Sequence, residues 1–222
     1  MNSLSQTLNS SIARKVVMAL TGLFLAAFLA EHLYGNLLLY YNDNGAAFNE
    51  YSHTMVHNIL IRMVEVFLFA AILLHVAQSI AITRKNNAAR PVKYQVRKDG
   101  ETSNWFSRNM GITGSVIFFF LVVHLRTFFV PYRITGIGED GSLALVVKEA
   151  FANGWYSSFY VAASLILGFH LNHGFQSAFQ TLGMNNKQYA GLIRNTGTVF
   201  AVVMGAGFAS FPIIFYFNLL GR

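Results

Sequence analysis

The stretch that decides the fold is residues 16–41, VVMALTGLFLAAFLAEHLYGNLLLYY, an apolar run that is interrupted by Glu31 and His32. A membrane-crossing helix needs ~20 mostly apolar residues to cross ~30 Å of hydrocarbon. The run meets that length, and it is too long for the apolar core of a signal peptide. It therefore predicts a transmembrane helix that carries an ionisable side chain inside the membrane.

The composition of the whole chain is typical of a membrane protein. Of the 222 residues, 54% are hydrophobic and only 11% are charged, against ~25% charged in soluble domains. This excludes a disordered chain, a coiled coil and an ordinary cytosolic enzyme. The chain has no cysteine, so it forms no disulfide and supplies no thiolate to an iron–sulfur cluster. A net charge of +7 fits basic loops on one side of a membrane better than it fits nucleic-acid binding.

Four more runs have the length of a membrane span, so we expect an all-α fold in which one transmembrane domain covers residues 1–222. The five expected spans are residues 16–41, 59–82, 110–130, 156–179 and 196–220. Eleven of the 16 Lys and Arg residues lie before span one, between spans two and three, or between spans four and five. By the positive-inside rule that side is cytoplasmic, which places the N-terminus inside and the C-terminus outside.

Each of the first four spans contains a histidine: His32, His75, His124, and either His170 or His173. A single buried histidine is ordinarily a hydrogen-bonded helix–helix contact, but one in each of four consecutive spans indicates function. At a rise of ~1.5 Å per residue, His32 and His124 lie towards the outside. By the same count His75 and His170 lie towards the inside. The helices therefore offer two bis-histidine sites, stacked across the bilayer.

A local repeat connects the two levels. Thr21 and Thr113, each followed by a glycine, stand 11 residues before His32 and His124. Eleven residues make almost three helical turns, so each threonine shares a face with its histidine and lies ~16 Å deeper, at the level of the other pair. We expect these small residues to line a planar cofactor that spans two and four hold. Ordinary helix packing by small residues is the alternative.

The arrangement of the ligands favours haem iron. A di-iron carboxylate site uses Glu-x-x-His motifs, but the residues three after Glu31 and Glu65 are Tyr34 and Leu68. Zinc prefers one compact cluster of three or four ligands, whereas these pairs lie a bilayer leaflet apart. Paired neutral imidazoles on facing helices suit the iron of two b-type haems.

In these residues the chain resembles the large di-haem, five-helix cytochrome b subunit of bacterial succinate:quinone oxidoreductases, which include succinate dehydrogenases and quinol:fumarate reductases. The likeness covers nearly the whole chain. Its motifs are Thr21-Gly22-Leu23-Phe24 up to His32-Leu33, Ala47-Phe48-Asn49 with His53, His75 followed by Lys85-Asn86-Asn87, Thr113-Gly114 up to His124, and Phe169-His170-x-x-x-Gly174 leading to Gly183.

The resemblance implies the ligands of both haems and favours one of two neighbouring histidines. It implies that His32 and His124 bind the outer haem and that His75 and His170 bind the inner haem. His170 is then preferred to His173, three residues later. In quinol:fumarate reductases an acid for proton movement stands two residues before the last ligand, where this chain has Gly168.

The resemblance also implies partners and a location. A flavoprotein with FAD and an iron–sulfur protein are implied on the cytoplasmic side, where the basic residues 84–108 are a candidate docking surface. The alternative is that these charges only set the membrane topology. The chain anchors them in the bacterial inner membrane and carries electrons between the iron–sulfur subunit and a quinone, expected to be menaquinone. No nucleic-acid partner is expected.

The quinone site of the family lies near the outer haem. On that side Glu50 and His53 are in the first outer loop, and Glu65 lies ~15 Å outward of His75, so these three are the candidates for quinone and proton handling. A plain ion pair with Arg62 is the alternative for Glu65. Two other functions stay open: the cytochrome b subunit of another quinone-linked dehydrogenase, and a membrane transporter without haem.

Overall fold

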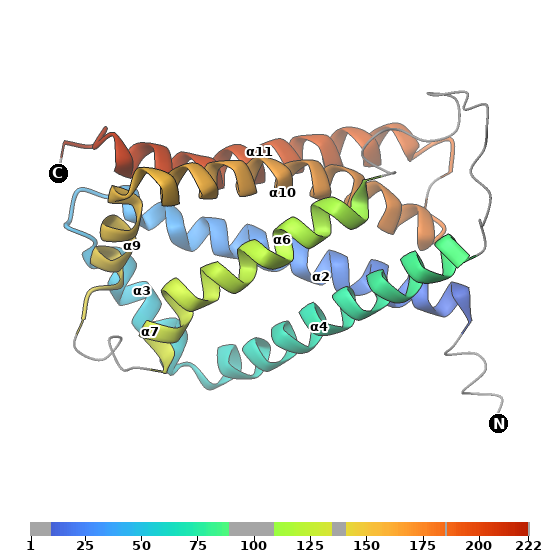
Figure 1. The fold of residues 1–222 in the computed structure, drawn as a ribbon, viewed down its shortest axis with the longest axis horizontal. Coiled ribbons are helices and arrows are strands. Elements are labelled where there is room, and N and C mark those ends of the chain that lie inside the picture. The colour runs from blue at the N-terminus through green and yellow to red at the C-terminus, as the bar shows by residue number, and fades with distance from the viewer. Residues whose placement is uncertain (1–9, 89–108, 135–140, 185, 222) are drawn as a thin grey trace.

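The computed structural model describes residues 10–88, 109–134, 141–184 and 186–221. Every regular element in these ranges is a helix, as predicted. Five long helices run alternately in opposite directions along the molecule, and two short helices, α3 (Ala46–His57) and α9 (Leu143–Ala152), lie at one end, called here the α3/α9 end (Figure 1). Most of the basic segment 84–108 lies outside the described residues.

Each predicted span overlaps one long helix. The long helices are α2 (Ser11–Leu37), α4 (Ile59–Ala88), α6 (Met110–His124), α10 (Gly154–Thr181) and α11 (Ala190–Tyr216). A 3₁₀ turn, η1 (Leu38–Tyr40), extends α2, whereas a π-helical turn, η2 (Leu125–Phe129), and α7 (Val130–Arg133) extend α6. α2 begins earlier than predicted because the Ser10 side chain accepts a hydrogen bond from the Ala13 amide and caps the helix.

Four helices in the described residues are long and apolar enough to cross a membrane. They are Ser11–Tyr40, Ile59–Asn86, Met110–Arg133 and Ala190–Tyr216. Large apolar side chains such as Phe67 and Val199 are exposed on them, which gives the chain the character of a multi-pass membrane protein. α10 has 28 residues but is not among these four.

α10 and α11 form the most extensive helix–helix interface in the described residues. A Cβ on Gly168 would lie 3.1 Å from the carbonyl oxygen of Ala201, and a Cβ on Gly205 would lie 3.3 Å from that of Ser164. Glycine at both positions lets the two backbones approach closely, as is typical of membrane helices. An acidic side chain at Gly168 would meet the backbone of α11 in this arrangement of the helices.

The other long helices form a ring. α2 contacts α4 and α10, whereas α6 contacts α10 and, only slightly, α4. α2 and α6 therefore stand diagonally opposite each other, as do α4 and α10. This arrangement determines which histidines can face each other across the ring.

The two short helices lie within the predicted outer loops and pack on each other. The side chain of Asn49 in α3 donates a hydrogen bond to Ser142 at 2.9 Å and accepts one from the Ala144 amide at 3.0 Å. Ahead of α3, the carboxylate of Asp43 accepts a 2.8 Å bond from the Ala47 amide. This bond, with others from the same turn, holds the pKa of Asp43 below its ordinary value. Local hydrogen bonds thus close the α3/α9 end.

Candidate functional site

The candidate site consists of four histidines from the four helices of the ring. His32 is on α2 and His124 on α6, which stand diagonally opposite each other. His75 is on α4 and His170 on α10, the other diagonal. Each diagonal therefore carries one of the two histidine pairs that were predicted from their depth in the membrane.

His32 and His124 lie side by side towards the α3/α9 end. Their ring centres are 5.8 Å apart and the ring planes are nearly perpendicular, at 85°. Phe28 stacks on His32 at 5.4 Å, Phe208 lies 5.9 Å from it, and Phe128 lies 5.3 Å from His124. The pair therefore lies in an aromatic, apolar environment.

The separation of this pair fits a shared metal ion. Two imidazoles that bind one ion from opposite sides, each at about 2 Å, have ring centres roughly 6 Å apart, close to the 5.8 Å between His32 and His124. In the described residues no three His, Asp or Glu side chains gather at a possible metal site. A haem iron needs no such group, because it takes only two ligands from the protein. The residues fit a haem.

His75 and His170 each contact a threonine of the helix beside them. The Thr21 hydroxyl lies 3.2 Å from Nδ1 of His75, and the Thr113 hydroxyl lies 3.2 Å from Nδ1 of His170. His170 is also close enough to His75 for electrostatic interaction. Both threonines therefore lie at the level of this pair, the depth that the repeat predicts.

The hydroxyl protons decide which nitrogen of each ring carries hydrogen. Thr21 donates its single proton to the carbonyl of Val17 at 2.8 Å, and Thr113 donates to that of Met110 at 3.2 Å. A hydroxyl that keeps its proton on the carbonyl accepts from the imidazole, and in that state Nδ1 of His75 carries the hydrogen. The contact of Thr113 with His170 allows the same state. Nε2 is left with a lone pair, the state that a metal-ligating histidine requires.

The glycines after the two threonines give the imidazoles room. A Cβ on Gly22 would lie 3.2 Å from Cε1 of His75, tighter than ordinary contact. A Cβ on Gly114 would lie 3.6 Å from Cε1 of His170, an ordinary contact distance. The two halves of the repeat are therefore alike in contacts but differ in tightness.

His173 lies one turn further along α10 than His170 and is half-buried. The threonine contact of α6 goes to His170. His173 is close enough to His170 for electrostatic interaction, so it is placed beside the proposed ligand.

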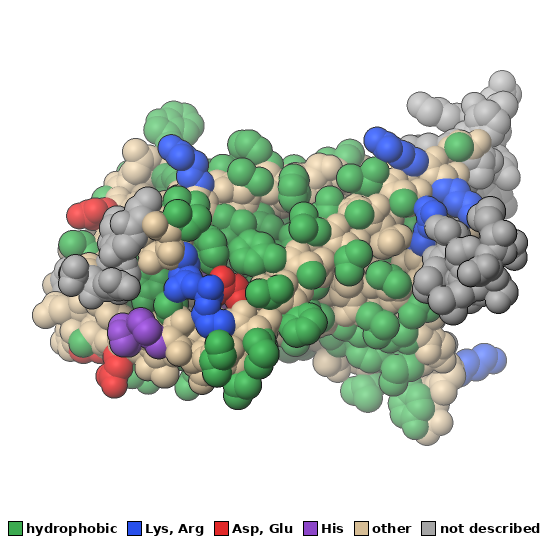
Figure 2. Space-filling model, turned by 90° about the horizontal axis from the view of Figure 1, so that it is seen from below, with side chains coloured by type: hydrophobic (Ala, Val, Ile, Leu, Met, Phe, Trp, Pro, Cys, Tyr) green, Lys and Arg blue, Asp and Glu red, His purple; other side chains and the backbone are tan. Residues whose placement is uncertain are grey.

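The three quinone candidates lie at the α3/α9 end but form no common cluster in the described residues. Glu50 is exposed on α3, and His53 stacks on His57 with ring centres 4.0 Å apart. The carboxylate of Glu65 forms an ion pair with Arg62 at 2.5 Å. This ion pair is the alternative to a role of Glu65 in proton handling. Figure 2 shows acidic, basic and histidine side chains close together at this end of the face seen from below.

Glu31, beside His32, has an unexpected partner. The hydroxyl of Tyr51 in α3 donates a hydrogen bond to its carboxylate. Burial, followed by the bond to Glu31, raises the pKa of Tyr51 above its ordinary value. The contact fixes α3 against α2 next to the His32–His124 pair.

Two tyrosines of α10 belong to the site but are absent from the sequence predictions. The hydroxyl of the buried Tyr160 lies 3.3 Å from Nδ1 of His124, and Tyr156 donates to Tyr160 at 2.8 Å. The sequence does indicate the depth of Tyr160. It precedes His170 by ten residues, or ~15 Å along the helix, which places it at the level of the His32–His124 pair.

The chain changes helix type directly after His124. α6 ends there and the π-helical turn η2 follows. Single π-helical turns are frequent at functional sites because they shift the side chains that come after them. Here Phe128 of that turn packs against the His124 ring.

Comparisons of the chain with models of protein families, with curated proteins and with solved structures find no match.

Proposed function

We propose that the chain is the membrane-anchor cytochrome b subunit of a succinate:quinone oxidoreductase of the bacterial inner membrane. Two b haems would be held by His32 with His124 and by His75 with His170. Electrons would pass through them between an iron–sulfur subunit on the cytoplasmic side and a quinone, expected to be menaquinone, near the outer side. The dicarboxylate chemistry would belong to a flavoprotein partner that carries FAD.

One observation carries the proposal above all others. Histidines from diagonally opposite helices pair at two levels, and Nδ1 of His75, His170 and His124 each meets a hydroxyl group. A helix-packing histidine needs only one partner on a neighbouring helix. A metal ligand needs its second nitrogen oriented while the first stays available, and this arrangement meets that need.

When bound, a haem supplies a carrier for single electrons. The residues of the chain orient and shield it. Thr21 and Thr113 hold the imidazoles of one pair in one tautomer. Phe28, Phe128 and Phe208 surround the other pair and exclude water from it.

The proposal includes a membrane topology of five spans. α10 would be the fourth crossing, in addition to the four apolar helices. Its polar residues are then a consequence of its place in the ring, because its buried side includes Ser157 and Ser164. The N-terminus would lie in the cytoplasm and the C-terminus outside.

Glu50, His53 and Glu65 would exchange protons with the quinone at the outer side. A quinone takes up two protons with two electrons, so its site needs titratable groups near water. The exposed Glu50 and His53 meet that need. Full quinone-linked turnover in Glu50→Gln, Glu65→Gln and His53→Ala would remove these residues from the proposal.

The test starts with a reduced-minus-oxidised spectrum of the complex purified with its native partners. We expect a sharp alpha band from two haems and covalent flavin in the complex. His75→Ala should lose the inner haem and keep at least part of the outer one. His57→Ala, which removes an exposed histidine of α3, is the matched control.

Three outcomes would contradict parts of the proposal. The lack of an alpha band would favour a transporter without haem. Haem without flavin would favour another quinone-linked dehydrogenase. Loss of haem in His173→Ala but not in His170→Ala would exchange the fourth ligand.

A further inference from the structure

Five basic residues lie apart from the eleven that gather at the other end of the bundle: Arg62, Arg126, Arg133, Lys148 and Arg222. Three of the five are arginines of α4, η2 and α7, towards the α3/α9 end. The positive-inside rule accounts for the eleven but not for this minority. The three arginines therefore need an explanation other than topology.

α4 and α7 bring two of these arginines together. The rings of Phe69 in α4 and Phe129 in η2 are 5.4 Å apart. Arg133 follows Phe129 by four residues, and Glu65 precedes Phe69 by four. Because α4 and α6 run in opposite directions, Arg133 and Glu65 both lie ~6 Å nearer the α3/α9 end than the two rings. Residues four apart share a helix face, so Arg133 lies opposite Glu65 and its partner Arg62.

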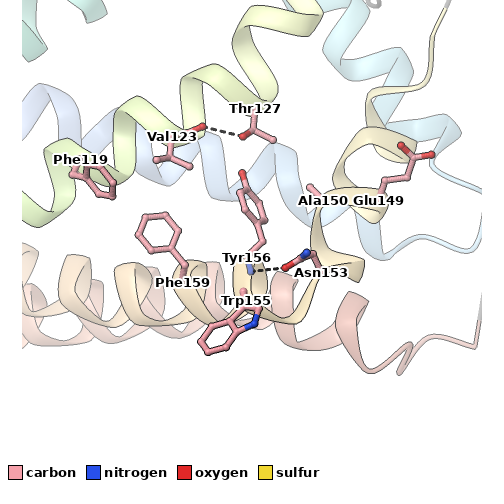
Figure 3. A pocket seen from close by; sticks show the side chains of 9 residues that line it. All are labelled: Phe119, Val123, Thr127, Glu149, Ala150, Asn153, Trp155, Tyr156 and Phe159. Carbon is pink, nitrogen blue, oxygen red and sulfur yellow. Dashed lines mark hydrogen bonds between the residues drawn. The ribbon is translucent and has the colours of Figure 1, made fainter.

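Arg126 lies on the outward side of the same helix. Figure 3 shows Phe119, Val123 and Thr127 on the side that is turned to α10, where the Thr127 hydroxyl donates to the Val123 carbonyl at 3.0 Å. Val122 and Arg126 each stand one residue earlier, about a quarter of a turn away, and both are exposed. Arg126 therefore points away from α10, and it lies ~4.5 Å deeper than Phe129.

Arg133 has a donor without an acceptor. Its Nε is buried and makes no hydrogen bond within the described residues. An arginine that only reaches for water keeps its charged head exposed, whereas a buried donor without an acceptor costs free energy. Arg62 gives Nη1 to Glu65 but has further N–H donors, because a guanidinium carries five. An acceptor from outside the chain would satisfy both arginines.

The charge of this group favours an anion. Three arginines and Glu65 give a net charge of +2. Figure 2 shows Lys and Arg side chains beside an acidic one at the α3/α9 end of the face seen from below. Arginine matches phosphate particularly well, because its planar fork donates two parallel hydrogen bonds to two phosphate oxygens.

Deeper in the bundle the same two helices present apolar surface. Leu73 follows Phe69 by four residues and is 66% exposed, and Val122 precedes Arg126 by four and is 52% exposed. Both belong to helices that are long and apolar enough to cross a membrane. A charged end above an exposed apolar surface matches a phospholipid, whereas a soluble anion would use the arginines alone.

We propose that Arg62, Arg126 and Arg133 bind the phosphate of an anionic phospholipid such as phosphatidylglycerol, whose acyl chains lie along α4 and α6. The net charge of +2 favours an anionic head group over a zwitterionic one. The inference goes beyond the proposed function. It requires that the α3/α9 end lies at one surface of a membrane, and it requires no haem.

The test titrates the purified full chain, stripped of lipid in detergent, with phosphatidylglycerol and measures bound lipid by native mass spectrometry. We expect Arg133→Gln to weaken binding about tenfold or more, because hydrogen bonds from a charged donor are lost. Arg126→Gln, which replaces an exposed side chain, should also weaken it. The unfolding temperature without lipid reports the fold of each variant, and Arg126→Gln carries the test if Arg133→Gln is destabilised.

The matched control is Lys148→Gln, which makes the same change of charge in α9 at the same end. It should bind phosphatidylglycerol as the wild type does. An equal loss in this variant would mean that the lipid responds to overall charge and that no specific site exists.

Two further ligands identify what is recognised. We expect weaker binding of phosphatidylcholine and no competition from sn-glycerol 3-phosphate. Equal affinity for phosphatidylcholine would leave only apolar contact with lipid, and competition by glycerol phosphate would make this a site for soluble anions.

Binding within about twofold of the wild type in Arg62→Gln, Arg126→Gln and Arg133→Gln would overturn the inference. A chain without haem bands would overturn the proposed function and leave this result unchanged, so the two can fail separately.

Discussion

At the scale of single residues, the hydroxyl groups beside three of the four histidines, His75, His124 and His170, are the most informative feature. Thr21 and Thr113 each donate to a backbone carbonyl and lie within hydrogen-bond distance of an imidazole Nδ1. A ligand whose Nδ1–H is hydrogen-bonded is more basic and stabilises oxidised iron. The threonine contacts therefore favour the tautomer of His75 and His170 that carries its hydrogen on Nδ1.

The first prediction concerns these threonines. Thr21→Val should retain the inner haem but raise its midpoint potential by up to about 60 mV, the equivalent of a hydrogen bond of about 0.5–1.5 kcal/mol. A redox titration of the purified complex measures the shift. Thr21→Ser, which restores a hydroxyl, should return the potential towards the wild-type value. Equal potentials in the valine and serine variants would show that the contact has no electronic effect.

The second prediction uses the unequal tightness of the two glycines. Gly22→Ala places a methyl group 3.2 Å from Cε1 of His75, so the ring must move by a few tenths of an ångström. Gly114→Ala meets His170 at 3.6 Å and needs no movement. Low-temperature EPR of the oxidised complex should therefore change its inner-haem signal in Gly22→Ala alone. A change in Gly114→Ala of the same size would mean that the glycines act through general packing.

Some of these residues could be predicted from the sequence and others could not. Depth counting pairs the histidines and places Thr21 and Thr113, because a helix has a constant rise. The same count reaches Tyr160, but only the rotation of α10 about its axis shows that its hydroxyl faces His124. The ion pair of Glu65 with Arg62 follows from their spacing of three residues.

At the scale of elements, the close approach of α10 and α11 positions His170. Gly168 is two residues before it and faces the backbone of α11. We predict that Gly168→Ala destabilises the protein by about 1–3 kcal/mol, the usual cost of overpacking. The measurement is the temperature at which haem is released on heating.

Gly174→Ala is the control for this variant, because a Cβ at Gly174 of the same helix meets nothing within 4 Å. Without a clash, alanine should leave stability unchanged or raise it slightly, since it favours helix more than glycine does. Equal release temperatures for the two variants would show that α10 and α11 can separate at no cost.

The elements differ in how readily the sequence reveals them. Each of the five long helices overlaps a predicted span, because a long apolar run is a strong signal. α3 and α9 have 12 and 10 residues, too few to stand out from a polar loop. The π-helical turn η2 leaves no mark in hydrophobic periodicity, since it inserts a single residue.

At the scale of the whole molecule, the topology rests on whether α10 crosses the membrane. The natural chain has no cysteine, so a single introduced cysteine reports its own location without background. Glu149 and Lys187 are both exposed and lie on either side of α10. In intact cells we expect a membrane-impermeant maleimide to label Glu149→Cys and to leave Lys187→Cys unlabelled until the membrane is permeabilised.

Labelling of both variants from the same side would mean that α10 returns to the side where it began and that only four spans exist. Labelling of Lys187→Cys alone would reverse the orientation and move the His32–His124 pair to the cytoplasmic level. Both variants replace exposed side chains, so the haem spectrum serves as a check that the fold is unchanged.

The diagonal pairing of the helices also sets an order of biogenesis. The ribosome delivers α2, α4 and α6 before α10, so His32 and His124 can meet while the chain is still being translated. His75 waits for its partner until α10 is inserted, and α10 gains its main packing partner only when α11 follows. The His32–His124 rings are thus the first pair to be synthesised, but Tyr160 of α10 and Phe208 of α11 complete their surroundings only when the last two helices arrive.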